Sequence, residues 1–417
     1  MSLEQKTNKE PCKVQESSGA GTETRRVGVA IVGVGGAVAT TAIAGIAMIR
    51  KGIVDTDGLP LADLDVRGLD ELAPYENLVF GGWDLSGDDL TDAAVSHGVM
   101  DKAQIYAVKD DLDAVKPWPA AGNPEFCRNV AGDNVVVANG HREQVDLIKR
   151  DLHAFREEHA LDEVVLVNLA STERVVDLEA GVFASVEAFE RGLDNSDSRI
   201  GPAMIYAYAA ITSGVPYVNF TPSSAADIPA LTELANRENI PVAGRDGKTG
   251  QTMIKTVLAP AFKARGLKVE GWFSTNILGN RDGLALDDAD SLASKITTKG
   301  SVLDEMLGYE VEDHIVSIHY YKPRGDAKEA WDNVDLVGFM GRKMQIKVNF
   351  LCSDSILAAP LVIELVRLVD LAKRRGEGGV QEQLGLFFKA PMVENGNAPE
   401  HAFHEQGKLL ADWISGA

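Results

Sequence analysis

The chain has 417 residues, too many for one small core, so we expect two domains or one large α/β domain with an insertion. Its formal net charge of −21 argues against a nucleic-acid partner, because phosphate backbones require a basic face. Three cysteines without a CxxC pair fit a reducing compartment and no disulfide framework, and we therefore expect a cytoplasmic protein.

Residues 1–26 are polar and without periodicity, which predicts a disordered tail. No charge then interrupts the chain from Val27 until Arg50. This run is long enough for a membrane helix, which needs about 20 apolar residues. Arg25-Arg26 followed by Ala-Ile-Ala at 42–44 also resembles a twin-arginine export signal.

The run changes character halfway, and this change favours a third interpretation. Residues 27–32 are β-branched and strand-like, Gly33-Val34-Gly35-Gly36 is a turn, and residues 37–50 are alanine-rich and helix-forming. A glycine turn between a strand and a helix N-terminus binds phosphate. The third place of the GxGxxG pattern is Val38, however, so a plain buried strand–helix unit stays an alternative.

Strand and helix signals alternate through the next hundred residues. Residues 142–156 place Val145, Ile148, Leu152 and Phe155 on one helical face. The elements expected after this helix are a strand at 163–170, a helix at 202–213, a strand at 215–220, a helix at 224–237 and a strand at 240–244. The alternation predicts a doubly wound parallel sheet that binds ligands at the carboxyl ends of its strands.

The pattern shifts to longer strand runs between about residues 265 and 350. These runs are KVEGWFSTN, HIVSIHYY and KMQIKVNF, and they predict a second sheet inserted into the first domain. The apolar helix expected at 355–374 returns to the first domain. We therefore predict a first domain at 27–252, an inserted α+β domain at 253–355 and a returning segment at 356–417.

Several short segments with polar or glycine residues lie along the chain: FGGWD at 80–84, VNLASTER at 167–174, GRDGKTGQT at 244–252, NILGNRDG at 276–283, GDAKEAWD at 325–332 and FFKAPM at 387–392. In order and spacing, these segments resemble signature segments of the myo-inositol-1-phosphate synthase family. The glycine turn and the loop NFTPSSAAD depart from many members and are similar to the shorter prokaryotic branch. The resemblance runs from about Val27 to Trp413 and favours dinucleotide binding over a membrane or export segment.

The resemblance implies a Rossmann-like NAD-binding domain and an inserted domain for catalysis and tetramer formation. It also implies an isomerase that converts glucose 6-phosphate to inositol 3-phosphate. In this reaction NAD oxidises C5, a C6 proton is lost, the resulting enolate attacks the C1 aldehyde, and the hydride returns to C5. Such chemistry requires positive charge where the phosphate, enolate and alkoxide lie.

Four lysines match the active-site lysines of the family: Lys295, Lys299, Lys328 and Lys389. By resemblance, Lys295 handles the C5 hydroxyl proton, Lys299 binds phosphate with Thr249, and Lys328 and Lys389 stabilise oxygens at C1 and C5. Asp326 and Asp354 match carboxylates that orient these lysines. Without the resemblance, most of the four would be read as solvated surface lysines; Lys389 is the exception, because Phe387-Phe388 precede it.

Other site residues also follow from the resemblance. The cofactor-binding residues are Gly33, Val34, Gly35, Gly36, Ala37, Val38, Asp84, Ser171, Thr172, Asp246, Thr249, Asn276 and Asp282. The substrate-binding residues are Thr249, Asn276, Asn280 and Lys299. Asp246 and Asp282 are candidates to hold a cation, as hard oxygen ligands. The expected assembly is a homotetramer built on the inserted sheet, without membrane or nucleic acid.

Three other functions compete with this interpretation. A simple NAD-dependent dehydrogenase shares the first domain but releases NADH. A non-catalytic sugar-phosphate sensor would lack one or more of the four lysines, all of which are present. A membrane-anchored protein would use residues 27–49 as its anchor.

Overall fold

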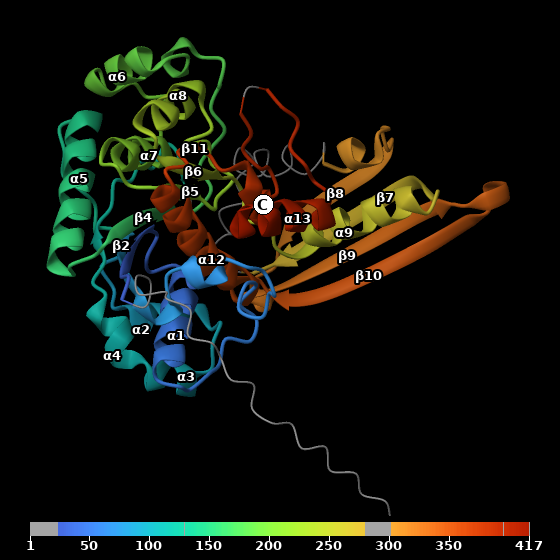
Figure 1. The fold of residues 1–417 in the computed structure, drawn as a ribbon, viewed down its shortest axis with the longest axis horizontal. Coiled ribbons are helices and arrows are strands. Elements are labelled where there is room, and N and C mark those ends of the chain that lie inside the picture. Colours follow the sequence, from blue (N-terminus) through green and yellow to red (C-terminus); the bar gives the residue numbers. More distant parts are fainter. Residues whose placement is uncertain (1–23, 129, 280–301, 395, 417) are drawn as a thin grey trace, which may run out of the picture.

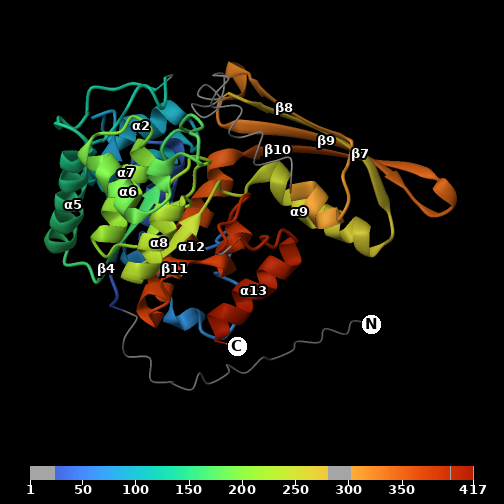
Figure 2. The same cartoon turned by 90° about the horizontal axis from the view of Figure 1, so that it is seen from above.

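Two β-sheets organise the computed structural model, which describes residues 24–128, 130–279, 302–394 and 396–416. A seven-stranded sheet with helices on both faces forms the larger body. A four-stranded sheet extends from this body as an arm in both views (Figures 1 and 2).

The seven-stranded sheet is parallel throughout, with strand order β11-β6-β5-β4-β1-β2-β3. Its strands are β1 (Val27–Val32), β2 (Leu78–Asp84), β3 (Trp118–Pro119), β4 (Glu163–Asn168), β5 (Tyr217–Asn219), β6 (Pro241–Gly244) and β11 (Gly379–Val380). The direction of strand addition reverses between β1 and β4, which is where a doubly wound sheet binds a dinucleotide. The predicted fold class is therefore confirmed.

Helices cover both faces of this sheet (Figure 1). Successive residues of β1 point to opposite faces, so Val29 and Ile31 pack in one core and Ala30 and Val32 in the other. The face of Val29 is covered by α1 (Ala37–Arg50), α2 (Leu90–His97), α3 (Lys102–Ala107), α4 (Lys109–Ala114) and α12 (Asp354–Arg375). The face of Ala30 is covered by α5 (His141–Glu158), α6 (Val186–Asp194), α7 (Pro202–Thr212) and α8 (Pro229–Glu238).

The helix predicted at 142–156 forms as α5, and its four apolar residues are all buried. FGGWD, one of the segments that carry the resemblance, forms the last five residues of β2. Gly82 lies so close to β1 that a Cβ atom there would come within 2.0 Å of the Ile31 carbonyl oxygen. Gly82 thus permits close strand pairing and Gly81 leaves room for Phe155 and Trp118, whereas Asp84 ends the strand at the ligand-binding edge.

The four-stranded sheet has the order β10-β9-β7-β8. Its strands are β7 (Lys268–Leu278), β8 (Asp313–Tyr320), β9 (Ala327–Val337) and β10 (Lys343–Ser353). β7 and β8 are parallel, and β9 runs antiparallel to both of its neighbours. Helix α9 (Gly250–Ala264) and residues 302–307 pack on one face, where Phe262 and Trp272 belong to the core.

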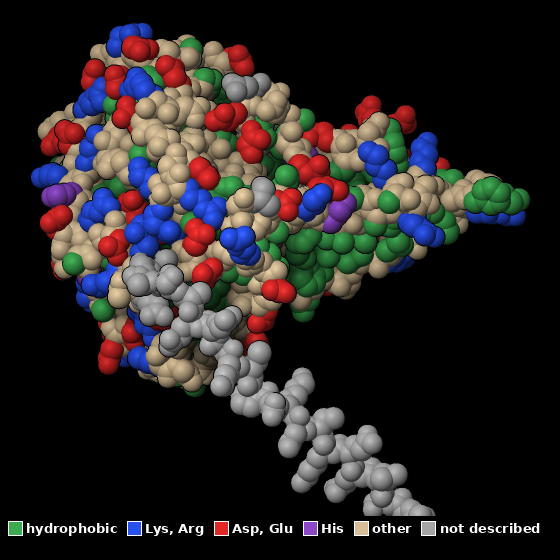
Figure 3. All heavy atoms as spheres, viewed as in Figure 1, with side chains coloured by type: hydrophobic (Ala, Val, Ile, Leu, Met, Phe, Trp, Pro, Cys, Tyr) green, Lys and Arg blue, Asp and Glu red, His purple; other side chains and the backbone are tan. Residues whose placement is uncertain are grey.

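The other face of the arm carries exposed apolar side chains. Phe273, Ile315, Trp331 and Leu351 are about half exposed, at 46%, 50%, 49% and 59%. Between β9 and β10, at the tip, Phe339 is 90% exposed. Apolar side chains gather along the arm and at its tip in Figure 3. Such a contiguous apolar surface is typical of an interface.

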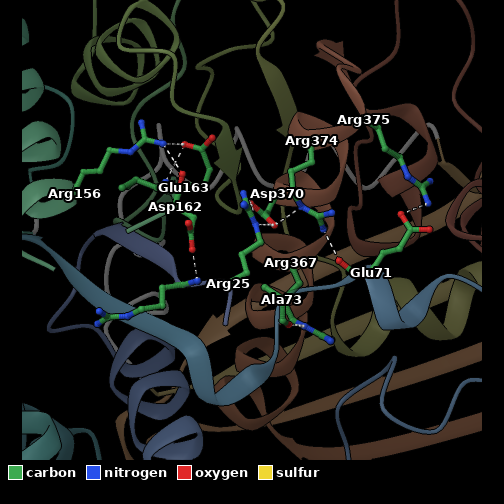
Figure 4. Close-up of polar contacts among 12 residues, drawn as sticks. Arg25, Glu71, Ala73, Arg156, Asp162, Glu163, Arg367, Asp370, Arg374 and Arg375 are labelled. Atoms are coloured by element: carbon green, nitrogen blue, oxygen red, sulfur yellow. Dashed lines mark hydrogen bonds and ion pairs between the residues drawn. The ribbon is translucent and has the colours of Figure 1, made fainter. Parts of the chain in front are cut away.

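The opening stretch forms β1, a turn and α1, as the nucleotide-binding interpretation predicts. No helix among the described residues is both long and apolar enough to cross a membrane. Arg25 and Arg26 belong to the folded body: Arg25 pairs with the buried Asp370 of α12, and the Arg26 backbone N–H donates to Asp162 (Figure 4). Of the tail predicted at 1–26, residues 24–26 belong to the described part, and residues 1–23 lie outside it.

Candidate active site

A cavity of about 560 Å³ lies at the carboxyl ends of β1, β4, β5 and β6 and reaches the start of α12. Most of the predicted site residues line it. They are Gly33, Gly36, Ala37, Val38, Asp84, Ser171, Thr172, Asp246, Thr249, Asp326, Lys328, Asp354 and Lys389. One cavity thus joins the glycine turn to two of the four predicted lysines.

The glycine turn has the properties of a site for a dinucleotide. Gly33 has a φ of +88°, a conformation that strains any residue with a side chain. Helix α1 begins without a side-chain cap and without an acidic residue in its first turn. Its N-terminal N–H groups and the helix dipole therefore favour an anion such as a pyrophosphate.

Asp84 completes this part of the cavity. Its Oδ2 accepts a hydrogen bond of 2.8 Å from the Gly35 N–H, and its Oδ1 accepts one from Ser86. An acidic residue at the end of β2 is the usual acceptor for ribose hydroxyls. Gly35 acts through Asp84 and does not itself line the cavity, and Val34 is buried in the core. The residues present therefore fit NAD.

Lys389 and Asp246 form a buried ion pair in the wall of the cavity. The Lys389 Nζ lies 2.6 Å from the Asp246 Oδ1, and the Lys389 backbone N–H donates to the Asp246 carbonyl at 2.7 Å. The two residues come from loops that follow β6 and the short helix at 382–387. A buried ammonium beside a cavity can stabilise negative charge that develops on a substrate oxygen.

Lys328 and Asp354 form a second pair, joined by Thr249. The Lys328 Nζ lies 3.3 and 3.4 Å from the two carboxylate oxygens of Asp354, and the Thr249 hydroxyl donates to Oδ1 at 3.0 Å. Lys328 comes from β9, Asp354 begins α12, and Thr249 precedes α9. The four-stranded sheet thus contributes a lysine to a cavity that is otherwise lined mainly by residues at the strand ends of the seven-stranded sheet.

Asp326 lies in the cavity wall and accepts hydrogen bonds from two serines. The resemblance predicts that it orients a lysine; among the described residues its partners are Ser353 and Ser355, whose hydroxyls both donate at 2.6 Å, while the Ser355 N–H donates at 3.2 Å. Its own carbonyl accepts from the Asp354 N–H. Asp326 therefore fixes the start of α12 and, through it, the position of Asp354.

Besides Val34 and Gly35, five more of the predicted residues are absent from the lining of the described cavity. Asn276 is buried and donates to Gln251 at 2.5 Å, away from the cavity lining, and its Oδ1 has no partner among the described atoms. The remaining four, Lys295, Lys299, Asn280 and Asp282, lie outside the described residues.

Sequence reasoning missed Glu173, although it belongs to the segment VNLASTER that we singled out. Glu173 lines the cavity and is buried, and its Oε1 accepts a hydrogen bond of 2.8 Å from the Ala203 N–H. Burial raises the pKa of Glu173 to about 7, against the opposing effect of that hydrogen bond. Nothing in the sequence marks it as buried, because its polar neighbours favour an exposed loop.

A metal site receives no support from the described residues. No group of three or more His, Cys, Asp or Glu side chains among them is arranged to hold a metal ion. The carboxylate of Asp246, one of the two candidate ligands, is bonded to Lys389.

Comparisons with known proteins agree with this geometry. The model of an NAD-binding family described as Myo-inositol-1-phosphate synthase matches residues 27–415. The chain is 42% identical over 405 residues to Inositol-3-phosphate synthase 1 of Bacteroides thetaiotaomicron, covering 93% of this chain and 94% of that protein.

Two solved structures share the fold. Inositol-3-phosphate synthase from Caenorhabditis elegans superposes with a TM-score of 0.88 at 28% identity, covering 94% of this chain and 86% of that one. A myo-inositol-1-phosphate synthase-related protein from Thermotoga maritima superposes with a TM-score of 0.74 at 27% identity, covering 93% and 98%. The chain belongs to the myo-inositol-1-phosphate synthase family.

Proposed function

We propose that the protein is an inositol-3-phosphate synthase that converts D-glucose 6-phosphate to 1D-myo-inositol 3-phosphate with recycled NAD. The observation that carries this proposal is the single cavity that joins the glycine turn to Lys328 and Lys389. An enzyme that only transfers a hydride needs the glycine turn for its cofactor and does not need the two lysines. An enzyme that also forms an enolate and closes a ring needs cations at several substrate oxygens.

NAD supplies a hydride acceptor at C5 and afterwards the donor that reduces C5 again. The protein binds its pyrophosphate at the start of α1 and its ribose at Asp84. Lys389, held by Asp246, and Lys328, held by Asp354, donate hydrogen bonds to the oxygens at C5 and C1 as these gain negative charge. The paired carboxylates keep both ammonium groups in place.

The remaining roles rest on the resemblance. Lys295 exchanges the proton of the C5 hydroxyl, and Lys299 binds the phosphate together with Thr249. Asn276 and Asn280 bind the substrate, and Ser171 and Thr172 the cofactor. Asp246 and Asp282 would hold a cation, which would offset negative charge on the substrate phosphate, and turnover before and after chelation tests this part of the proposal.

We also propose that the protein assembles as a homotetramer through the arm. The exposed apolar side chains of its outer face, among them Phe273, Trp331 and Leu351, support this assignment. The proposed division into a first domain at 27–252, an inserted domain at 253–355 and a returning segment follows the sheets. Every strand of the second sheet lies between Lys268 and Ser353, and β11 completes the first sheet. The proposed location is the cytoplasm.

The decisive experiment measures product and redox state together. The purified protein is supplied with glucose 6-phosphate and substoichiometric NAD, and inositol phosphate is quantified while absorbance reports NADH. Product in excess of NAD, without steady accumulation of NADH, is the expected result. Stoichiometric NADH would instead assign the protein to the ordinary dehydrogenases, and binding without turnover would indicate a sensor.

A further inference from the structure

Residues 245–249, which include the cavity-lining residues Asp246, Gly247 and Thr249, are held by backbone pairing with residues 387–390. The Arg245 N–H donates to the Ala390 carbonyl, and the Lys248 N–H donates to the Phe387 carbonyl, at 3.0 and 2.8 Å. A bridge between Gly247 and Phe388 lies between them. The segment that carries Asp246 and Thr249 therefore has a fixed backbone on one side.

Side chains along this segment point in two directions. Asp246 and Thr249 line the cavity, whereas Lys248 does not. The Lys248 Nζ donates to the Oε1 of Gln406 and lies 5.5 Å from the centre of the Phe403 ring. Both partners belong to α13 (Phe403–Ser415), the last helix of the chain. Lys248 thus connects the C-terminal helix to the backbone between two site residues.

The environment of Lys248 is unusual for a lysine. Its side chain is buried, with 4% exposed, and among the described residues no carboxylate lies within ion-pair distance. Burial lowers the pKa of Lys248 to about 7. A buried amine without a carboxylate partner weakens folding, and an apolar side chain of similar length would fit such a place better.

Gln406 is the hydrogen-bond acceptor for the Lys248 amine. It is 2% exposed, and while its Oε1 accepts from Lys248, its Nε2 donates to the Glu400 carbonyl at 2.5 Å. His401 also faces this place, and its ring nitrogen lies 3.1 Å from Glu305. Both the oxygen and the nitrogen of the Gln406 amide are therefore hydrogen-bonded, which fixes the position of the acceptor for Lys248.

We infer that Lys248 is a positioning residue, whose bond to Gln406 of the C-terminal helix holds Asp246 and Thr249 in register with Lys389 and Asp354. The inference rests on the proposed function. Lys248 touches neither cofactor nor substrate in this assignment. It acts because a displacement of about 1 Å in a catalytic group can lower the rate by about 10²-fold.

Four variants test the inference. Lys248→Met removes the amine but keeps the length of the side chain, and Gln406→Leu removes the acceptor. Gln406→Glu keeps an acceptor at the same position. Lys408→Met is the matched control, since Lys408 is exposed on the same helix. The measurements are kcat and KM, NAD affinity, thermal midpoint, and hydrogen exchange of the peptide 244–252.

Lys248→Met and Gln406→Leu should each lower kcat about tenfold or more and speed hydrogen exchange of 244–252 about tenfold. NAD affinity should fall by less than kcat, because the glycine turn that receives the pyrophosphate follows β1 and is not part of the segment 245–249. The thermal midpoint of Lys248→Met should be unchanged or higher, because a desolvated amine is removed. Lys408→Met should turn over within about threefold of the parent protein. Gln406→Glu should lose less turnover than Gln406→Leu, because it keeps the acceptor for Lys248 although it loses the donor to the Glu400 carbonyl.

Two results overturn the inference: a kcat of Lys248→Met within about twofold of the parent, or unchanged exchange of 244–252 in that variant. A fall in kcat that only parallels unfolding would reduce Lys248 to a structural residue, and this also contradicts the inference. Failure of the proposed function looks different, because the parent protein would then form no inositol phosphate. Hydrogen exchange would still decide whether Lys248 holds the segment.

Discussion

The Nζ of Lys389 lies 2.6 Å from the Oδ1 of Asp246, although 143 residues separate them along the chain. Their side chains are only 6% and 4% exposed, so the pair is shielded from water in the wall of the cavity. One backbone hydrogen bond, from the Lys389 N–H to the Asp246 carbonyl, joins the same two residues, so both the backbone and the side chains hold them together.

Lys389→Met should reduce turnover by about 10²–10³, the usual effect of removing one well-placed donor. It should also lower the free energy of unfolding by about 3–5 kcal/mol, because Asp246 loses its partner while buried. Adding Asp246→Asn to the same chain should recover most of the stability and none of the turnover. Urea unfolding and product assays measure the two effects separately. Recovery of turnover in the double variant would contradict a catalytic role for Lys389.

Asp354→Asn should lower kcat about 10- to 100-fold with little change in stability, because the amide keeps the shape but removes the charge beside Lys328. The asparagine oxygen still accepts from Thr249. The matched control is Asp313→Asn, because Asp313 is an exposed carboxylate of the four-stranded sheet that also carries Lys328. Equal rates for the two variants, measured at saturating substrate, would mean that the Lys328–Asp354 pair does not serve the reaction.

Gly35→Val should abolish NAD binding while the protein stays folded. A Cβ atom at Gly35 would lie 3.1 Å from the Asp84 Oδ2 and would displace the carboxylate that binds ribose. Gly45 provides the control, because nothing lies within 4 Å of a Cβ atom at that position of α1. Gly45→Ala should keep NAD affinity and raise stability by about 0.5–1 kcal/mol. Unchanged NAD content in Gly35→Val, measured by release from denatured protein, would contradict the assignment of the turn.

Glu173 should make the nucleotide-free protein less stable as pH rises. Burial raises the pKa of this carboxyl from 4.5 to about 7, so between these values the folded protein holds a proton that the unfolded chain has released. The free energy of unfolding should therefore fall across this window, by at most about 3 kcal/mol.

Glu173→Gln should remove this slope and be the more stable protein at pH 8. Urea unfolding at pH 5 and pH 8 measures the change in the free energy of unfolding, and Glu179→Gln, at an exposed position, is the control. The same pH slope in the parent and in Glu173→Gln would show that Glu173 is not the group responsible.

The two lysines outside the described residues can be tested by kinetics. Lys299→Ala should weaken glucose 6-phosphate binding most, because its partner is the phosphate. Lys295→Ala should block oxidation, so that no transient NADH absorbance forms even in a single turnover. Each should lose about 10²–10³ in turnover, whereas a solvated lysine would leave the rate unchanged. Near-normal rates in both variants would remove them from the mechanism.

Periodicity predicted the elements whose burial is one-sided or complete. Helix α5 buries one stripe and strand β4 is buried throughout, and both patterns are visible in the sequence. β9 was not predicted as a strand, because its buried face includes Lys328 and Asp332 and its exposed face includes Glu329 and Trp331. Charged residues on the buried face of a strand break the alternation of apolar and polar residues by which a strand is predicted. Here one of them, Lys328, lines the cavity.

Most of the predicted residues within the described part line the cavity, but which of them contact one another could not be predicted. The family resemblance identified Lys389 and Asp246, yet nothing in the sequence pairs them or assigns Asp326 to two serines. Lys248 could not be found at all, because its burial depends on α13, more than 150 residues later in the chain. Contacts of this kind depend on how distant segments pack, which local patterns do not encode.

The pairing of Arg25 with Asp370 has a consequence for how the chain is made. These residues are 345 positions apart, and α12 covers the sheet face formed by Val27, Val29, Ile31, Val165 and Val167. A ribosome must therefore synthesise nearly the whole protein before that face can be covered. Until then the nascent chain presents an apolar surface that attracts chaperones or other nascent chains. A chain that stops before Asp354 should accordingly aggregate, even though six of the seven strands of its main sheet are complete.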